Sequence, residues 1–485
     1  MLVDTLPRFV VSELVCEHII ACQLPLWPVS QPRAHSASSF KRVSLSLCSQ
    51  GLDVKIMLST RAATTLAQLD IPWRFTPAAR DLFDAESNPE GIISLAKAEN
   101  PLMYDDLVEF SSKVEFPPAS FTYGSSSFGG PRLAAALATH VNETFNPFSP
   151  VLPSDIQIVN GATSLHSVLA FSLAEQGDAI LAPRPVYGRF ELDLGNAMGV
   201  KVAYADCASA EALEPSVVVL CEEALQKAKV GGINVKAVLV VNPSNPLGRC
   251  YPRETLVGLL EFCQRHQLHL ISDEVYGLSV FGPGTGSSRG LHPFTSVLSI
   301  DLTDLIDPNL VHVEYGTSKD FAAAGLRLGA LITKNRELQR SVQAVGRFHE
   351  PSGMSVAIGT AMFEDREWCR AFILNARARI GDAYKFVTGR LSEIGISYLE
   401  ANAGYFVLID LAPWLPPEGK VYDTTQQREF ALAEKLVEGG VFLHPGEEHA
   451  LEAGKFRLVY TQQRPVITEG LKRLDAVLKS VDWSV

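Results

Sequence analysis

Several features that would place this chain in a special class of proteins are missing from it. No run of about 18 uncharged apolar residues occurs in the sequence, so no membrane-spanning helix is expected. Positive charge is not in excess: 42 Lys and Arg face 54 Asp and Glu, and the net charge of −12 argues against a nucleic-acid or anionic-membrane partner. The eight cysteines form no CxxC pair, which favours reduced thiols in a cytoplasmic protein and no metal site.

What is present is the composition of an ordinary globular chain, with 47% hydrophobic and 20% charged residues. The 485 residues suffice for two or three domains. Residues 1–56 differ from the rest, because an apolar stretch interrupted by Glu13, Glu17 and His18 precedes a basic, Ser-rich stretch. A secretory signal would need a basic leader. We therefore expect a disordered extension or a wrongly assigned start, with Met57 as the alternative first residue.

Short apolar runs alternate with helix-like stretches through the middle of the chain, which is typical of an α/β layer with a mainly parallel sheet. We expect a seven-stranded large domain over residues 113–345. Beyond it, a long helical stretch and the runs YFVLIDL and KFRLVY predict a smaller α+β domain over residues 346–485, which residues 57–112 would join. The expected strands of the large sheet are 156–159, 179–182, 200–204, 237–241, 268–272, 310–314 and 328–332.

Polar and aromatic residues follow several of these strands, and ligands of open α/β sheets bind beyond the carboxyl ends of the strands. The small residues of NGATS, after the first strand, begin a helix whose N-terminal amides could bind a phosphate. Tyr187 follows the second strand, where its ring could stack on a planar ligand. Two Asn-Pro pairs follow the fourth strand, and the second leaves the amide of Asn245 for a ligand oxygen. Each feature alone also has an ordinary structural explanation as a cap, a half-buried ring or a turn.

Charged residues follow the fifth and sixth strands. Asp273 ends an apolar run, with Tyr276 three residues later, and is either a helix cap or the partner of a protonated ring nitrogen. Lys319 and Arg327 stand in VEYGTSKDFAAAGLRLGALI, a run whose small and apolar residues are typical of a core. A lysine with a depressed pKa in an apolar pocket is a nucleophile that forms Schiff bases. A single lysine, however, is most often a surface residue.

Pyridoxal phosphate is the one ligand that needs all of these features together. Its aldehyde requires a lysine, and its ring nitrogen requires a carboxylate that keeps the nitrogen protonated, so that the ring can act as an electron sink. Its phosphate suits a helix N-terminus and a guanidinium group, and its phenolic oxygen takes an amide and a tyrosine. The order in which these residues follow the strands therefore predicts pyridoxal 5'-phosphate as the cofactor.

From about residue 75 to residue 480, the sequence resembles the class I and II aminotransferase family, which has fold type I of the pyridoxal-phosphate enzymes. Within this family its sequence motifs most resemble those of 1-aminocyclopropane-1-carboxylate (ACC) synthases and of fungal relatives from gliotoxin-type secondary-metabolite clusters. The resemblance implies a homodimer and a small substrate of the amino-acid type. The motifs that carry it jointly are AENPLM, NGAT, NPSNPLGRCYPRE, SDEVYG, YGTSKD followed by GLRLG, AGYFVLIDL and FRLVY.

The resemblance also implies a role for each matching residue that would contact the cofactor. Lys319 would bind it covalently, Asp273 would pair with its ring nitrogen, and Tyr187 would stack on its ring, which makes these three the candidate catalytic residues. Asn245 and Tyr276 would contact its ring oxygen. The residues that would bind its phosphate are Ala162, Thr163, Ser318 and Arg327.

Three residues would face the substrate under the same resemblance. Arg457 in FRLVY matches the arginine that binds the α-carboxylate. Glu99 in AENPLM matches the acid that borders the substrate in ACC-synthase-like sequences. Tyr123 in TYGSSSFGG lies near the place of the tyrosine that one subunit lends to the site of its neighbour.

The sequence departs from the family pattern at two places. Gly316 stands where relatives have a phosphate-binding serine, and the loss of that hydroxyl should weaken the phosphate site. Glu447 and Glu448 replace small hydroxyl residues, and they should disfavour dicarboxylate substrates if they face the site.

The activity that the resemblance implies is that of an aminotransferase acting at Cα of an amino acid or of a derived intermediate, in fungal secondary metabolism. The residues determine a shared carbanion chemistry and leave its outcome open. A carbon–sulfur lyase and an ACC synthase are therefore alternatives. A catalytically silent, cofactor-binding regulatory relative is a further alternative, against which the presence of Lys319 argues.

Overall fold

The computed structural model describes residues 58–70, 81–123, 127–282, 291–419, 421–446 and 449–483. The chain divides into two units, Met1–Met57 and Leu58–Val485, and every described residue belongs to the second unit. The expectation for residues 1–56 therefore lies outside the described residues.

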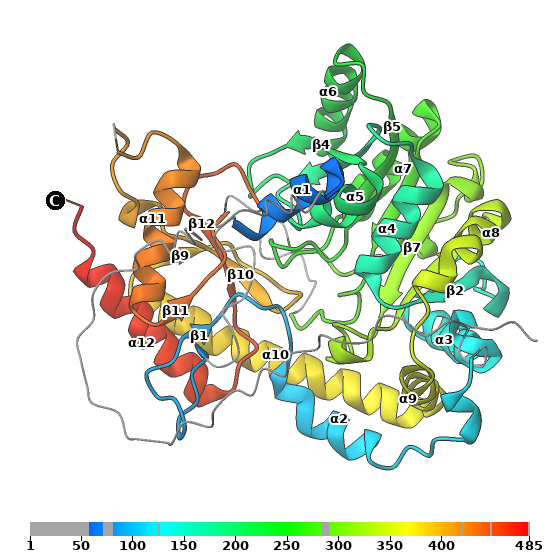
Figure 1. Ribbon diagram of the computed structural model, residues 1–485, viewed down its shortest axis with the longest axis horizontal. Coiled ribbons are helices and arrows are strands. Elements are labelled where there is room, and N and C mark those ends of the chain that lie inside the picture. The colour runs from blue at the N-terminus through cyan, green and yellow to red at the C-terminus, as the bar shows by residue number, and fades with distance from the viewer. Residues whose placement is uncertain are drawn as a thin grey trace, which may run out of the picture. The chain divides into compact units, whose positions relative to one another are not determined.

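The largest sheet of this unit has seven strands, in the order β2-β8-β7-β6-β5-β3-β4. Figure 1 labels four of them, β2, β4, β5 and β7. Only β8 runs antiparallel to its neighbours within this sheet. The prediction of an α/β fold with a mainly parallel seven-stranded sheet is thus confirmed. Each strand begins within two residues of an expected one: β2 (Ile156–Val159), β3 (Ala179–Arg184), β4 (Lys201–Asp206), β5 (Val235–Val241), β6 (His269–Asp273), β7 (Val311–Gly316) and β8 (Gly329–Thr333).

Both faces of the sheet are buried, because successive residues of a strand point to opposite sides. On β5, Val238 and Val240 belong to one apolar core, together with residues of α3 (Gly130–Thr144), α6 (Val217–Val230) and α7 (Arg253–His266). Leu239 and Val241 belong to the other core, together with residues of α4 (Ala162–Leu173), α5 (Phe190–Met198) and α8 (Arg336–Val345). This double burial explains why the strands appear in the sequence as continuous apolar runs.

The C-terminal part of the chain forms a second, smaller layer. Its antiparallel sheet has the order β12-β10-β9, and β11 pairs in parallel with β1, so the N-terminal segment joins this layer. Side chains of Ser352, Asp365 and Thr424 cap its helices α9, α10 and α11. The elements are β1 (Ile93–Ser94), α9 (Gly353–Glu364), α10 (Arg366–Glu393), β9 (Ser397–Tyr398), β10 (Phe406–Asp410), α11 (Thr425–Glu438), β11 (Val441–Phe442), β12 (Lys455–Val459) and α12 (Arg464–Ser480).

Two further helices, α1 (Thr60–Leu66) and α2 (Tyr104–Ser111), precede the large sheet in the chain. Helix α9 packs on α3, so the exact boundary between the large and small domains stays a prediction. Among the helices of the described ranges, none has the length and apolar character needed to cross a lipid bilayer.

Candidate active site

One cavity of about 300 Å³ gathers most of the residues that the sequence singles out. It lies where the carboxyl ends of β5, β6 and β7 meet the segment Ala96–Glu99 and β12 of the smaller layer. Tyr123 does not line it, and this side chain is fully exposed. The predicted residues that do line it are Glu99, Ala162, Thr163, Tyr187, Asn245, Asp273, Tyr276, Ser318, Lys319, Arg327 and Arg457.

The N-terminus of α4 and the guanidinium group of Arg327 lie together at one end of the cavity. Gly161, which precedes α4, has a φ of +102°, and a β-carbon there would come within 2.6 Å of Arg327 Nη2. Ala162 and Thr163 carry first-turn amides, which have no partner within their own helix. A guanidinium group beside a helix N-terminus suits an anion such as phosphate. Arg327 itself is exposed, although the small and apolar run in which it stands is typical of a core.

Lys319 follows β7 and points into the cavity from the side of the sheet. Its amine donates a hydrogen bond of 2.6 Å to Ala98 O and lies 5.7 Å from the ring centre of Tyr276. Burial and the nearby charge of Arg457 lower the pKa of Lys319 to about 8. The backbone is held as well, since the Tyr405 hydroxyl donates to Lys319 O. Lys319 is therefore a fixed amine of which about a tenth is neutral at pH 7, a far larger fraction than for an ordinary lysine.

The depressed pKa of Lys319 predicts how the apoenzyme should react with pyridoxal phosphate across pH. Only the neutral amine attacks an aldehyde, so the rate of covalent capture should rise from pH 7 to pH 9 with a midpoint near 8. The R457Q variant removes one cause of the depression and should move that midpoint upward. Stopped-flow absorbance of the apoenzyme mixed with the cofactor measures both rates. A wild-type rate that still rises steeply beyond pH 10 would contradict the assignment.

Asp273 stands at the end of β6 and faces the same cavity. Its Oδ1 accepts a hydrogen bond of 3.2 Å from Val275 N. Burial and the charge of Glu314 raise the pKa of Asp273 to about 7, against the opposing charges of His166 and Lys319. A carboxylate in this setting gains strongly from a cationic partner such as a protonated ring nitrogen.

The two Asn-Pro pairs have different tasks. Asn242 is structural: its Oδ1 accepts from Tyr251 N at 3.1 Å, and its Nδ2 donates to Thr295 O at 2.8 Å. Asn245 lies in the cavity, where its Oδ1 accepts a hydrogen bond of 2.9 Å from Arg457 Nη1. The same guanidinium group donates from Nη2 to Ala96 O at 2.7 Å. A buried arginine held in this way presents a fixed fork for a carboxylate.

The remaining predicted side chains border the same space. The Tyr187 ring is half-buried and meets Phe190 edge to face, with ring centres 5.2 Å apart. The carboxylate of Glu99 forms an ion pair of 2.9 Å with Lys97 and accepts a hydrogen bond of 3.2 Å from the Tyr104 hydroxyl. The carboxylate of Glu99 thus lines the cavity as one member of an ion pair with Lys97.

Gly316 has a different surrounding from the one expected. A β-carbon at this position would meet Leu328 O at 2.5 Å, because β7 and β8 approach closely at the pair Gly316 and Gly329. Gly316 is not among the residues that line the cavity, whereas Ser318, also predicted to bind the phosphate, is. Glu447 and Glu448 lie outside the described residues.

Sequence reasoning missed several cavity residues, namely Lys97, His166, Arg189 and His444, and it missed Glu314 behind them. Two of these carried a signal. His166 comes four residues after Ala162, which places it on the same face of α4. Glu314 is a charged residue within a buried strand, where charges are rare unless they are paired.

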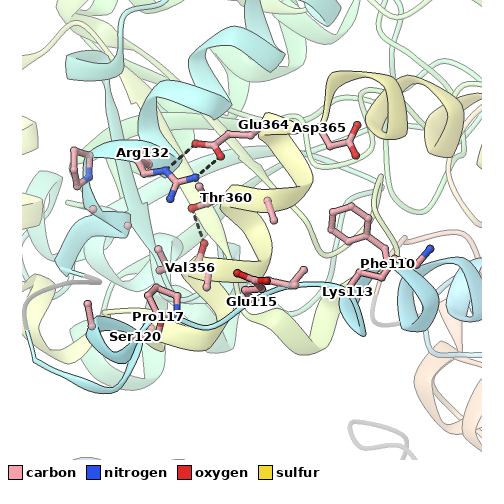
Figure 2. A pocket seen from close by; sticks show the side chains of 18 of the residues that line it. Phe110, Lys113, Glu115, Pro117, Ser120, Arg132, Val356, Thr360, Glu364 and Asp365 are labelled. Carbon is pink, nitrogen blue, oxygen red and sulfur yellow. Dashed lines mark hydrogen bonds and ion pairs between the residues drawn. The ribbon is translucent and has the colours of Figure 1, made fainter.

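A second hollow of about 600 Å³ lies beside α2, α3 and α9, and it is larger than the first (Figure 2). Its most prominent charges satisfy each other, because Arg132 Nε and Nη2 donate to the two carboxylate oxygens of Glu364 at 3.0 and 2.5 Å. The Thr360 hydroxyl donates to Val356 O within the same helix at 2.6 Å. None of the residues that line this hollow follows a strand of the large sheet. Size alone therefore does not identify the reactive site.

A doubly covered, mainly parallel sheet with a half-buried lysine, a strand-end aspartate and an anion site at the N-terminus of α4 is typical of the pyridoxal-phosphate enzymes of fold type I. The family model described as "Aminotransferase class I and II" matches residues 120–474, and the chain belongs to this family. Its members depend on pyridoxal phosphate.

Relatives support the same family, and solved structures show the same fold. The chain is 34% identical over 411 residues to "1-aminocyclopropane-1-carboxylate synthase-like protein 1" of Bos taurus, which covers 82% of this chain and 78% of the relative. It is 31% identical over 395 residues to "Probable aminotransferase aclI" of Aspergillus oryzae, with coverages of 80% and 90%. The fold is similar to that of an archaeal alanine:glyoxylate aminotransferase, with a TM-score of 0.65, 22% identity and coverages of 87% and 96%.

The residues in the cavity fit the cofactor on grounds of their own. The volume falls at the lower end of the range for small-molecule sites. A β-carbon on Gly161 would collide with the guanidinium group of Arg327. The glycine therefore leaves room for Arg327 and keeps the predicted phosphate end open to backbone amides. Lys319 and Asp273 then supply an amine for the aldehyde and a carboxylate for the ring nitrogen from the same sheet edge.

Proposed function

We propose that this protein is an aminotransferase that acts at Cα of an amino acid or of an amino-acid-derived intermediate, in fungal secondary metabolism. The observation that carries the proposal is that Lys319, Asp273 and Arg457 share one cavity with the anion site at α4. The likeness to the Aspergillus oryzae protein, which is named a probable aminotransferase, supports the reaction class. The metabolic setting rests on the resemblance of the motifs to gliotoxin-type fungal sequences.

Bound pyridoxal phosphate supplies an electron sink for the bond that breaks at Cα. Lys319 Nζ, with a pKa of about 8, accepts the Cα proton as general base and returns it as general acid. The ionised carboxylate of Asp273 would pair with the protonated ring nitrogen of the cofactor. Tyr187 and Tyr276 line the same cavity and would border the ring, and Tyr276 is fully buried.

Arg457 positions the substrate through its α-carboxylate. The guanidinium group is 4% exposed and is braced by Asn245 and Ala96, so its direction is set before the substrate arrives. This pre-organisation keeps the Cα–H bond near the amine of Lys319, because substrate and lysine meet in one small cavity. Glu99, paired with Lys97, borders the same space and is a candidate for contact with the substrate.

The products distinguish the possible outcomes. Formation of a keto acid that depends on an amino-acceptor keto acid is the result we expect, because it reports transamination. Release of pyruvate or a thiol without an acceptor would instead assign a carbon–sulfur lyase, and release of methylthioadenosine from S-adenosylmethionine would assign an ACC synthase. A protein that binds the cofactor and turns over none of a broad amino-acid panel would favour a silent, regulatory relative.

We further propose that two copies of the chain form a homodimer across the segments around Tyr123. The exposed aromatic residues Phe121, Tyr123 and Phe348 lie on two segments that pack together, since a β-carbon on Gly353 would meet Ser120 O at 2.0 Å. The second segment also borders the anion site, because His349 O accepts a hydrogen bond of 2.8 Å from Asn160 N.

A mixing experiment tests whether Tyr123 acts in the partner's site. K319A and Y123A should each be weakly active, and refolding them together should produce hybrids that contain one intact site. Activity of the mixture above the sum of the separate variants is the expected result. A monomeric protein, or a mixture no more active than its components, would contradict the shared site.

A further inference from the structure

Four titratable side chains lie close together in the interior behind the cavity. His166 Nδ1 lies 2.9 Å from Asp193 Oδ2, and His166 Nε2 lies 2.9 Å from Glu314 Oε2. Ligand atoms of His166, Glu314 and Asp273 all lie within 4.8 Å of one another. The side chains of His166 and Glu314 are 3% and 0% exposed, so water does not screen these charges.

The sheet forces two of these carboxyl groups together. Asp273 on β6 and Glu314 on β7 are register partners in the parallel pair, so their side chains leave the same face of the sheet. Two carboxylates this close in a dry interior oppose each other's ionisation. A positive charge between them removes the conflict.

His166 has the geometry to carry that charge. Both ring nitrogens face carboxylate oxygens, and a ring that donates from both nitrogens is an imidazolium. Burial alone would lower the pKa of His166, but the charge of Glu314 and the hydrogen bond to Asp193 raise it well above the usual value. Nδ1 makes a hydrogen bond to Asp193, and Nε2 lies at ion-pair distance from Glu314. A protonated ring between these two carboxylates has no lone pair for a metal ion.

We propose that His166 is a positioning residue that neutralises Glu314 and so allows Asp273 to remain ionised beneath the cofactor ring. The inference rests on the function proposed above. It adds His166 and Glu314, to which that function assigns no role. In this arrangement the charge of Glu314 opposes the ionisation of Asp273 unless His166 carries a positive charge. Loss of His166 should therefore be harmful because Glu314 is present, and not because a contact is missing.

A double-mutant comparison tests this dependence. In H166N, Asp273 and Glu314 share the available protons, and the affinity of the apoenzyme for pyridoxal phosphate should fall on the order of tenfold or more. E314Q keeps the shape of the side chain and removes its charge, so its affinity should stay within about threefold of wild type. The variant H166N/E314Q should regain most of the affinity lost in H166N. A merely structural role of His166 would leave the double variant as weak as H166N or weaker.

The pH dependence of cofactor affinity in the same variants is a second test of the proposal. The titratable groups that interact with Asp273 are Glu314, His166, Lys319, Glu274 and Tyr276, and Asp193 faces His166 from α5. Asp273 titrates near pH 7 in the wild type and should titrate higher in H166N. The affinity deficit of H166N should therefore shrink from pH 7 to pH 9, whereas a deficit that stays constant across this range would overturn the proposal.

Cofactor titrations followed by absorbance measure these affinities, and urea unfolding of each apoenzyme checks the fold. H166Q replaces H166N if the latter does not fold, and it should show the same rescue by E314Q. The wild type is titrated first. If the wild type does not bind the cofactor, the proposed function is wrong. If the wild type binds the cofactor and H166N binds it equally well, only the proposed role of His166 is wrong.

Discussion

Replacement of Lys319 by alanine should lower turnover by at least about 10³-fold and abolish covalent attachment of the cofactor. The expected loss is large because one amine has two tasks, attachment of the aldehyde and transfer of the Cα proton. The cavity offers no substitute nearby, since the other lysine that lines it, Lys97, is paired with Glu99 at 2.9 Å. Steady-state kinetics and the absorbance spectrum of the purified variant measure the two effects.

The matched control for this prediction is K201A. Lys201 is exposed on the edge strand β4, outside the cavity, so its loss should leave both the spectrum and turnover unchanged. Addition of a small primary amine should restore part of the activity of K319A, because the amine can take over the proton transfer. A K319A protein that keeps wild-type turnover would show that Lys319 is not the reacting lysine.

Replacement of Asp273 by asparagine should lower turnover by about 10²–10⁴-fold, because removal of one partner of a buried charge pair costs roughly 3–5 kcal/mol. Asparagine keeps the shape and the contact to Val275 N, so the loss reports the charge. The spectrum of the bound cofactor should also change, because its ring nitrogen loses the group that keeps it protonated. Kinetics and a pH titration of the absorbance measure both effects.

The stability of the same variant should change in the opposite direction. The folded-state pKa of Asp273, about 7, lies above its ordinary value of 3.8, so the unfolded chain releases this proton more readily. The contribution to stability is therefore present below pH 3.8 and is lost as the pH rises to 7. Apo D273N should be at least as stable as the apo wild type at pH 7.5, with a smaller difference near pH 4. An inactive D273N that is also clearly destabilised at pH 7.5 would point to misfolding.

The positions of the strands in the large sheet could be predicted from the sequence because each strand is buried on both faces. Such strands produce unbroken apolar runs, and the residues that follow them necessarily meet at one edge. Lys319, Asp273 and Asn245 were identified by this rule, and the structure places all three in one cavity. Arg457 was identified only through the family resemblance, because it comes from β12 in a different layer.

The rest of the site depends on contacts between distant segments, which no local pattern describes. A histidine in an apolar helix is most often an ordinary core residue, and only the approach of α4 to both α5 and β7 gives His166 its two carboxylate partners. The place of Gly316 likewise follows from the close approach of β8, and not from its own segment. Tyr123 is exposed and does not line the cavity of its own chain, so a second copy is required to test its predicted role.

Reduction of the purified protein with borohydride, followed by peptide mapping, tests the central claim most directly. The account predicts a yellow protein whose colour is lost on reduction, with a phosphopyridoxyl group on the peptide that carries Lys319 and on no other lysine. A colourless protein that takes up no pyridoxal phosphate, or a stable adduct at a different lysine, would contradict it.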